Sequence, residues 1–280
     1  MTTFANNATA AVSGDATATR AGDGPDAAVK SSMPSAARFP GMQVIVCSAQ
    51  KGGSGKTTLC GHLAVQAERA GAGPVALIDT DPQGSLAQWW NAREAETPVF
   101  MKAQVDFLHE DLRQLGRAGI RLVFVDTPPA VTEMIRRIVG FADLVVVPTK
   151  PSPHDLRAVG ATLDIVEGLG KPLVFAVNDA TPRARITGDT AVALSQHGTV
   201  APVIIGHRTS FATSMIYGQT VVETEPDSPG AGEIVALWDY LASRLVRSEV
   251  RPTRPVGVFS AAPAQGFGRR RAAKPELGTW

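Results

Sequence analysis

The sequence has few of the residues that build disulfide-rich or metal-binding proteins. Among its 280 residues are two cysteines, Cys47 and Cys60, and five histidines. Two scattered thiols do not make a disulfide framework and favour buried free cysteines. The histidines have no acidic or cysteine companions at ligand spacing, which argues against a transition-metal site. We therefore expect neither redox chemistry nor a zinc centre.

Long hydrophobic runs are also missing. The longest ones, such as 144–148 and 122–125, span about five residues, whereas a helix that crosses a bilayer needs roughly 20. Residues 1–10 have neither the basic region nor the apolar region of a secretory signal. We expect a cytoplasmic protein that does not cross a membrane.

Charge is balanced in sum and uneven along the chain. The 27 basic and 26 acidic residues give a net charge of +1. From residue 241 onward, eight basic residues stand against Glu249 and Glu276, so this end carries +6 and residues 1–240 carry −5. Such asymmetry indicates a polyanionic partner, the alternative being a solvated basic tail without a specific partner.

Composition divides the chain into three parts. Residues 1–40 are rich in Ala, Thr, Ser, Gly and Asp and cannot bury enough apolar surface to offset the entropy of ordering. Residues 249–280 contain four prolines among glycine and arginine, which disfavours a long helix. We expect a disordered arm over 1–40, one folded domain over 41–248 and a flexible basic tail over 249–280.

Within the folded part, short β-branched runs alternate with longer amphipathic stretches. The expected strands are 44–48, 75–79, 99–103, 122–126, 144–148, 173–178 and 203–205. The expected helices are 56–70, 85–93, 107–117, 132–139, 153–168, 189–196, 210–217 and 234–246. Strands that are apolar on both faces and separated by helices predict a three-layer α/β fold, with a mostly parallel sheet covered on each side. Ligands of such sheets bind beyond the carboxyl ends of the strands.

A glycine-rich segment, Gln-Lys-Gly-Gly-Ser-Gly-Lys-Thr-Thr over 50–58, joins the first expected strand to the first expected helix. Its glycines let successive amides turn toward one anion at the positive end of the helix. Lys56 would reach the β and γ phosphates, Thr57 would offer its hydroxyl to Mg²⁺, and Thr58 would bond the α phosphate. The predicted nucleotide-binding set is Gly52, Gly53, Ser54, Gly55, Lys56, Thr57 and Thr58. Gln50 stands where the usual motif has its first glycine.

Residues 51–58 resemble the deviant Walker A loop of the ParA/MinD ATPases, in which that first position need not be glycine. The resemblance runs from about 43 to 247. It extends to four further segments of the chain, at 78–85, 125–129, 151–156 and 208–223. It implies a P-loop NTPase fold, ATP and Mg²⁺ as ligands, and a slow Mg-dependent ATPase activity that a partner stimulates.

Lys51 lies five residues before Lys56 and has no evident task inside one protomer. In the family that this segment resembles, the equivalent lysine reaches across a dimer interface to the partner's nucleotide. The resemblance therefore implies a homodimer that holds two ATP molecules and separates after hydrolysis. The alternative is an ordinary surface lysine on a turn.

Three aspartates follow buried strands beside the phosphate loop. A carboxylate in this place can hold Mg²⁺ or orient the attacking water. We assign Asp126 to the metal shell with Thr57, and Asp79 to metal or water contact. By resemblance Asp81 is the residue most tied to hydrolysis, which completes a catalytic set of Lys51, Lys56 and Asp81. Because Pro82 follows it, Asp81 has the alternative of beginning a helix.

Two further motifs have competing interpretations. Asn178 ends an expected strand. Its side-chain amide could exchange hydrogen bonds with an adenine edge, as an asparagine does at a comparable place in MinD-like relatives. The alternative is that Asn178 forms an Asx-turn. The segment 152–155, Ser-Pro-His-Asp, is typical of a helix start with a capping serine and an acid near the positive end. We interpret this segment primarily as a structural motif that starts a helix.

The DNA-binding relatives collect arginine and lysine on the surface near the C-terminus and contact phosphates without reading bases. Arg208, Arg244 and Arg247 are the candidates here, with solvated helix arginines as the alternative. The sequence thus predicts a ParA-type ATPase that dimerises with ATP, binds nonspecific nucleoid DNA and leaves it after hydrolysis stimulated by a ParB-like or adaptor protein. Such an ATPase segregates plasmids or chromosomes, or positions a large protein cargo.

Other classes fit less well. A membrane-associated, MinD-like regulator of division is the main alternative, although prolines interrupt the tail that carries Phe259, Phe267 and Trp280. An iron-protein-type electron carrier would need cysteines placed to bridge two protomers, and Cys47 and Cys60 lie within the expected strand and helix around the phosphate loop. A P-loop ligase and a nucleotide-binding protein without hydrolysis complete the alternatives.

Overall fold

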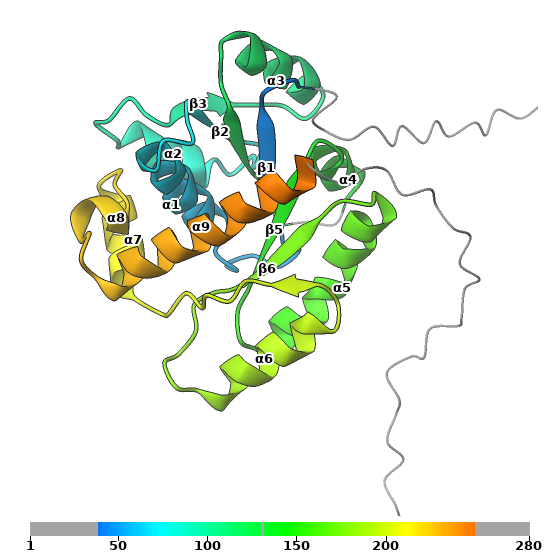
Figure 1. Cartoon of the computed structure of the whole chain (residues 1–280), viewed down its shortest axis with the longest axis vertical. Helices are drawn as coiled ribbons and strands as arrows, with labels where there is room; N and C mark the ends of the chain where they lie inside the picture. The colour runs from blue at the N-terminus through cyan, green and yellow to red at the C-terminus, as the bar shows by residue number, and fades with distance from the viewer. Residues whose placement is uncertain (1–38, 130–131, 250–280) are drawn as a thin grey trace, which may run out of the picture. The chain divides into compact units, whose positions relative to one another are not determined.

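The computed structural model describes residues 39–129 and 132–249, apart from the side chains of 247–249. In this part of the chain a seven-stranded sheet has the order β3-β2-β4-β1-β5-β6-β7 (Figure 1). Each neighbouring pair of these strands is parallel. The strands are β1 Gln43–Cys47, β2 Val75–Asp79, β3 Val99–Lys102, β4 Leu122–Asp126, β5 Leu144–Thr149, β6 Leu173–Val177 and β7 Thr199–Val200. The predicted α/β class is confirmed, and the sheet is parallel throughout.

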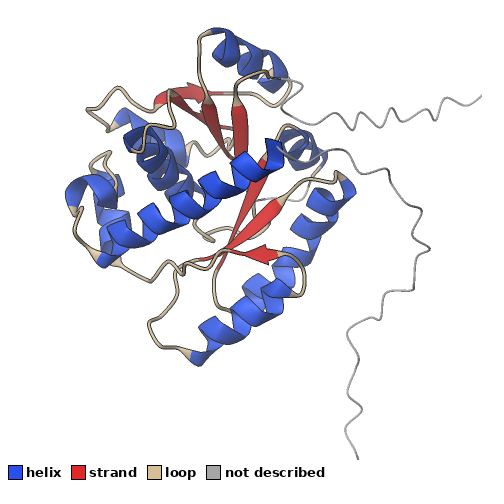
Figure 2. Cartoon of the chain, in the orientation of Figure 1, coloured by secondary structure: helices blue, strands red, loops and turns tan. Residues whose placement is uncertain are grey.

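Helices cover both faces of the sheet (Figure 2). One face packs against α1 Lys56–Arg69, α2 Ser85–Asn91, α7 Thr209–Ile216, α8 Val221–Thr224 and α9 Pro229–Glu249. The other packs against α3 Leu108–Arg117, α4 Glu133–Gly140, α5 Pro153–Gly168 and α6 Arg185–Ser195. Successive strand residues serve opposite faces: Ile45 and Cys47 join the first core, and Val44 and Val46 the second. This alternation explains why the strands are apolar on both sides.

The helices lie close to the predicted ranges, with three differences. Helix α6 begins at Arg185, ahead of the expected 189, and α9 begins at Pro229, ahead of the expected 234. Proline suits the first turn of a helix, so Pro229 begins α9 without loss of a hydrogen bond. Helix α8 is absent from the predicted set, because four residues are too few to display a helical period. It is held by a capping box between Thr220 and Glu223.

The predicted strand over 203–205 is wrong. The edge strand is β7, and Pro202, which has no N–H to donate, interrupts the pairing after Ala201 donates to the Phe175 carbonyl at 2.8 Å. Pairing resumes outside the named strands, where Ile205 donates to Val177 and a bridge joins Ala180 to Gly206. The bridge between Ala180 and Gly206 holds the loop after β6 beside the loop before α7.

The folded part includes Phe39, which lies within the predicted N-terminal arm. Phe39 is 3% exposed, and its ring lies 5.9 Å from that of His109 and 6.4 Å from that of Phe141. The rest of the predicted arm and nearly all of the predicted tail lie outside the described residues. Among the helices that the structure describes, none has the length and apolar character needed to cross a membrane.

Candidate nucleotide site

The phosphate loop connects β1 to α1 at the carboxyl end of the sheet. Gly53 and Gly55 have φ of 73° and 96°, in the left-handed region that glycine adopts without strain. At Gly55 there is also no room for a side chain, since a Cβ would lie 2.1 Å from Nδ2 of Asn178. Helix α1 begins directly after Gly55, and its first N–H groups have neither a partner within the helix nor a side-chain cap. The loop therefore has the shape of an anion cradle.

Lys56 lies at the base of this loop. Its side chain is largely buried, and Nζ donates to the main-chain carbonyl of Lys51 at 3.2 Å. Burial lowers the pKa of Lys56, and the carboxylates of Asp126 and Asp81 oppose that shift. A buried ammonium that is bonded to a neutral carbonyl is a strong site for an anion. The predicted phosphate contact is consistent with this geometry.

Thr57 and Asp126 are brought together as predicted. The Thr57 hydroxyl donates to Oδ2 of Asp126 at 2.6 Å, while the buried Oδ1 of Asp126 has no hydrogen-bond partner among the described residues. Burial raises the pKa of Asp126 to about 7, although the Thr57 hydrogen bond and the Lys56 charge lower it. A hydroxyl and a carboxylate with spare acceptor capacity are oxygen ligands that suit Mg²⁺. Because Mg²⁺ keeps several waters and binds phosphate as well, such a site needs only one or two protein ligands.

Asp79 lies at the carboxyl end of β2, as expected, and its metal or water contact stays a prediction. It is paired in register with Asp126 on the neighbouring strand and is fully buried. Its Oδ1 accepts the Asp81 N–H at 2.9 Å and its Oδ2 accepts the Ala87 N–H at 3.0 Å. Burial raises the pKa of Asp79 against the effect of these bonds. In this structure Asp79 positions the Asp81 turn and the first turn of α2.

Asp81 starts a turn, and the alternative that it caps a helix is wrong. Its Oδ1 accepts the Gln83 N–H at 2.9 Å, and its carbonyl accepts the Gly84 N–H at 2.9 Å. The N-cap of α2 is Gly84, which has φ of 67°. Asp81 is partly exposed and lies at the same sheet edge as the phosphate loop.

Asn178 contacts the phosphate loop. Its Nδ2 donates to the Ser54 carbonyl at 2.9 Å, in a buried position. This amide therefore ties the loop after β6 to the loop after β1, a contact that neither proposed interpretation of Asn178 included. The adenine contact stays a prediction.

Lys51 forms an ion pair within its own chain. Its Nζ lies 2.5 Å from Oδ2 of Asp155, and the two side chains are 42% and 3% exposed. Ser152 caps α5 by accepting the Asp155 N–H at 3.1 Å, which confirms the helix-start interpretation of 152–155. The ion pair with Lys51 adds a second function to this motif. No local pattern in the sequence indicates this pair, because about a hundred residues separate the two partners.

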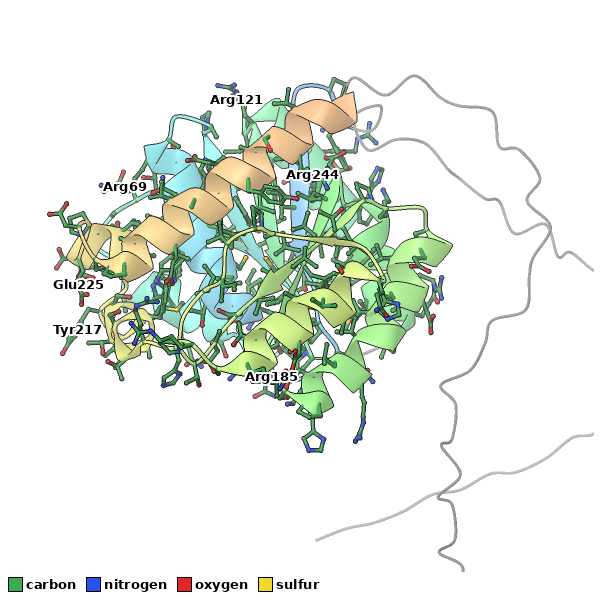
Figure 3. All side chains as sticks on the ribbon, turned by 60° about the horizontal axis from the view of Figure 1, so that its bottom comes forward. Arg69, Arg121, Arg185, Tyr217, Glu225 and Arg244 are labelled. Carbon is green, nitrogen blue, oxygen red and sulfur yellow. The ribbon has the colours of Figure 1, made fainter. Side chains whose placement is uncertain are left out.

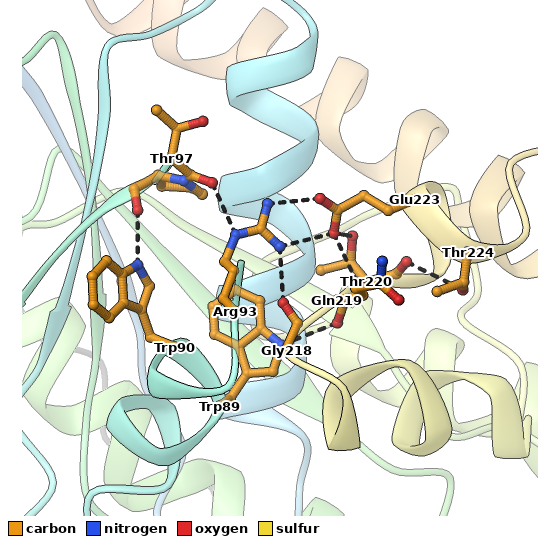
Figure 4. Close-up of polar contacts among 10 residues, drawn as sticks. Trp89, Trp90, Arg93, Thr97, Gly218, Gln219, Thr220, Glu223 and Thr224 are labelled. Carbon is orange, nitrogen blue, oxygen red and sulfur yellow. Dashed lines mark hydrogen bonds and ion pairs between the residues drawn. The ribbon is translucent and has the colours of Figure 1, made fainter. Parts of the chain in front are cut away.

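A buried polar network joins α2 to the α7–α8 turn (Figure 4). The Arg93 side chain is 4% exposed and donates to both carboxylate oxygens of Glu223 and to the carbonyls of Gly218 and Thr97. Burial alone would raise the pKa of Glu223, but hydrogen bonds from Arg93 and Thr220 hold it below its usual range. Gly218, with φ of 68°, packs so closely that a Cβ would lie 2.3 Å from the Arg93 main-chain nitrogen. The network fixes the end of the helix that follows Asp81.

Replacing Arg93 with alanine should destabilise the protein by about 3–5 kcal/mol, because it leaves the half-buried Glu223 carboxylate without its cation. Urea unfolding followed by circular dichroism measures this. Arg117→Ala is the matched control, since Arg117 makes an exposed 3.6 Å pair with Glu110 and should change stability by less than about 1 kcal/mol. Equal effects of the two substitutions would contradict the importance of the network.

Two of the candidate DNA-binding arginines, Arg208 and Arg244, lie apart from each other. Arg208, the N-cap of α7, pairs with Glu233 at 2.6 Å. Arg244 donates to Thr199 at 2.7 Å and lies over the Tyr240 ring, and Figure 3 shows it beside α9, away from Tyr217 at the end of α7. Along α9, Glu233 and Arg244 are about 16 Å apart. The side chain of Arg247 lies outside the described residues.

Comparison with known proteins identifies the family. A family model described as VirC1 protein matches residues 42–215. The chain is 30% identical over 187 residues to Maintenance of carboxysome distribution protein A of Halothiobacillus neapolitanus, covering 62% of this chain and 81% of that protein. It is 26% identical over 249 residues to the chromosome-partitioning ATPase Soj of Thermus thermophilus, covering 72% and 96%.

Solved structures agree on the fold. The MinD cell division protein of Aquifex aeolicus matches with a TM-score of 0.62 and 17% identity, covering 77% of this chain and all of that one. Similar structures include an ATP complex of a variant of Cyanothece McdA, at TM-score 0.57 and 16% identity over 72% of this chain and 96% of that one. They also include the Mg-ADP complex of Pyrococcus horikoshii MinD, at TM-score 0.61 and 14% identity over 74% and 98%. The fold and site define a P-loop nucleotide-binding protein. The chain belongs to the ParA/MinD family of ATPases and is of the partition and positioning type.

Proposed function

We propose that this chain is an Mg-dependent ATPase that dimerises with ATP, binds nonspecific DNA as the dimer and leaves it after hydrolysis. The observation that supports the nucleotide- and Mg-binding part of the proposal is the cluster at the start of α1. There a buried Lys56 ammonium, the Thr57 hydroxyl and the Asp126 carboxylate converge beside a glycine-shaped loop. Nucleotide is bound in two of the similar solved structures, with Mg in one of them.

Each residue of the site has a task that follows from its position. The amides of 52–58 and the Lys56 ammonium would bind the phosphates, and Asn178 holds the loop in shape through Ser54. Thr57 and Asp126 would hold Mg²⁺, which when bound neutralises charge on the β and γ phosphates. Asp79 fixes the turn on which Asp81 faces water. Asp81 would orient the attacking water, since phosphoryl transfer depends on positioning more than on covalent help from the protein.

The dimer and its targets are inferred from the family and from charge. The Lys51 side chain is 42% exposed, so it could release Asp155 of its own chain and reach the nucleotide of a second copy. The excess of basic residues from 241 onward would contact DNA phosphates, with Arg208, Arg244 and Arg247 as candidates. A ParB-like or adaptor protein would stimulate hydrolysis and so release the dimer from the nucleoid. The cargo would be a plasmid, a chromosome or a large protein assembly.

Replacing Asp81 with alanine should leave ATP binding intact and slow DNA-stimulated phosphate release by at least about tenfold, so that the protein stays on DNA. Co-sedimentation with plasmid DNA and a phosphate-release assay, both with MgATP, measure this. Asp164→Ala, at an exposed position on α5, is the control. Rapid turnover by Asp81→Ala would contradict the assignment, and co-sedimentation with liposomes in place of DNA would favour the MinD-like alternative.

A further inference from the structure

The loop that carries Lys51 is held by two contacts within its own chain. The Lys51 side chain pairs with Asp155, and the Lys51 main-chain carbonyl accepts from Nζ of Lys56 at 3.2 Å. Both contacts involve groups that, in the proposed function, bind nucleotide phosphates. Lys56 is needed by the protomer's own phosphates and Lys51 by those of a second copy. The pair with Asp155 therefore competes with the contact that Lys51 would make in the ATP-bound dimer.

Asp155 is the fixed member of its pair with Lys51. Its side chain is 3% exposed, and its Oδ2 also accepts a hydrogen bond from the Ser152 hydroxyl. Asp155 lies in the first turn of α5, where the positive end of the helix favours a carboxylate. Lys51 is the exposed member, with 42% of its side chain accessible to solvent. When the Lys51 side chain moves away, the Asp155 carboxylate still accepts the Ser152 hydrogen bond and still lies at the positive end of α5. The ion pair can therefore break and form again without a change in α5.

We propose that Asp155 is a positioning residue that holds Lys51 within its own protomer and thereby sets how readily the ATP-bound dimer forms. This inference rests on the proposed dimer. The Lys56 ammonium has three N–H donors, so it can bind the phosphates whether or not it keeps the Lys51 carbonyl. The side-chain pair with Asp155 is therefore the barrier that a second copy must overcome. Weakening this pair favours the dimer, and strengthening it favours the monomer.

The first experiment measures the pair in the full-length protein without nucleotide. Reductive methylation, quantified by mass spectrometry, reports how fast the Lys51 amine reacts. In the wild type it should react more slowly than the amine of Lys102, which is exposed and forms no salt bridge among the described residues. Asp155→Asn keeps the size of the side chain and an acceptor for Ser152, and should speed Lys51 labelling at least threefold. The control Asp164→Asn, on the same helix, should leave it unchanged, and Asp155→Glu should restore slow labelling.

The second experiment measures ATP-dependent dimerisation by analytical ultracentrifugation. Asp155→Asn should lower the dimer Kd about three- to tenfold, which is the range expected for losing an ion pair with one exposed partner. The affinity of the monomer for ATP should not change. Asp155→Glu, which keeps the ion pair, should restore the wild-type dimer Kd, and the control Asp164→Asn should leave it unchanged.

The possible results separate the two proposals. Equal Lys51 labelling in wild type and Asp155→Asn would overturn the ion pair, and a dimer Kd that is unchanged or raised would overturn its effect on assembly. A wild-type protein that binds ATP and stays monomeric would overturn the proposed dimer, and the labelling experiment would still decide whether Asp155 holds Lys51.

Discussion

Replacing Lys56 with alanine should raise the Kd for MgATP by at least about 100-fold. The ammonium is buried against the phosphate loop and is bonded there to a carbonyl, so the phosphates are its natural counter-charge. Charge-assisted hydrogen bonds to phosphate are about twice as strong as neutral ones, and this one forms in a site shielded from water. Isothermal titration with MgATP measures the loss directly.

Two controls isolate the effect of Lys56. Lys102→Ala removes an exposed lysine from the end of the edge strand β3 and should leave nucleotide affinity unchanged. Thermal unfolding should show that Lys56→Ala is folded, because burial lowers the pKa of Lys56 and the protein without nucleotide gains little from its charge. A Kd for MgATP equal to that of the wild type would contradict the phosphate site.

Asp126→Asn should stabilise the nucleotide-free protein while removing its Mg-dependent affinity for ATP. Burial raises the pKa of Asp126 to about 7 from an ordinary value near 4, so above pH 7 the folded protein holds an ionised carboxylate in a place that disfavours it. Asparagine keeps an acceptor for Thr57 without the charge. At pH 8 the free energy of unfolding should rise by about 2–4 kcal/mol. Asp126 thus lowers the stability of the nucleotide-free protein while serving its function.

The stability difference between Asp126→Asn and the wild type should depend on pH. A raised folded pKa means that the native state binds the proton more tightly, so the wild type is stabilised at low pH and loses that stabilisation as pH rises toward 7. The advantage of Asp126→Asn should therefore shrink by more than half between pH 8 and pH 5. Urea unfolding across this range measures it, with the exposed Asp164→Asn as control. A constant difference at all pH values would contradict the raised pKa.

Local features of the site could be predicted from sequence because each depends on neighbours along the chain. Glycines at 53 and 55 supply the positive φ of the loop, and the Lys56–Thr57 pair starts the helix behind it. Ser152 and Asp155 form a helix cap three residues apart, as their spacing predicted. The apolar runs indicated the strands, and parallel pairing then brought Asp79 and Asp126 into register. The short strand over 203–205 failed because Pro202 decides where edge pairing stops.

Contacts between distant residues required the tertiary structure. The two hydrogen bonds that Asp79 accepts, from the N–H groups of Asp81 and Ala87, could not be read from the strand pattern. Asn178 meets Ser54 only because β6 ends beside the phosphate loop, and Arg93 meets Glu223 only because α2 packs on the α7–α8 turn. Residue type and spacing along the chain determined the fold class, the phosphate loop and the family resemblance, because these are set by backbone conformation and periodicity. The partners of each buried charge were decided by packing, since a charge inside the protein must bond whatever polar group the fold places next to it.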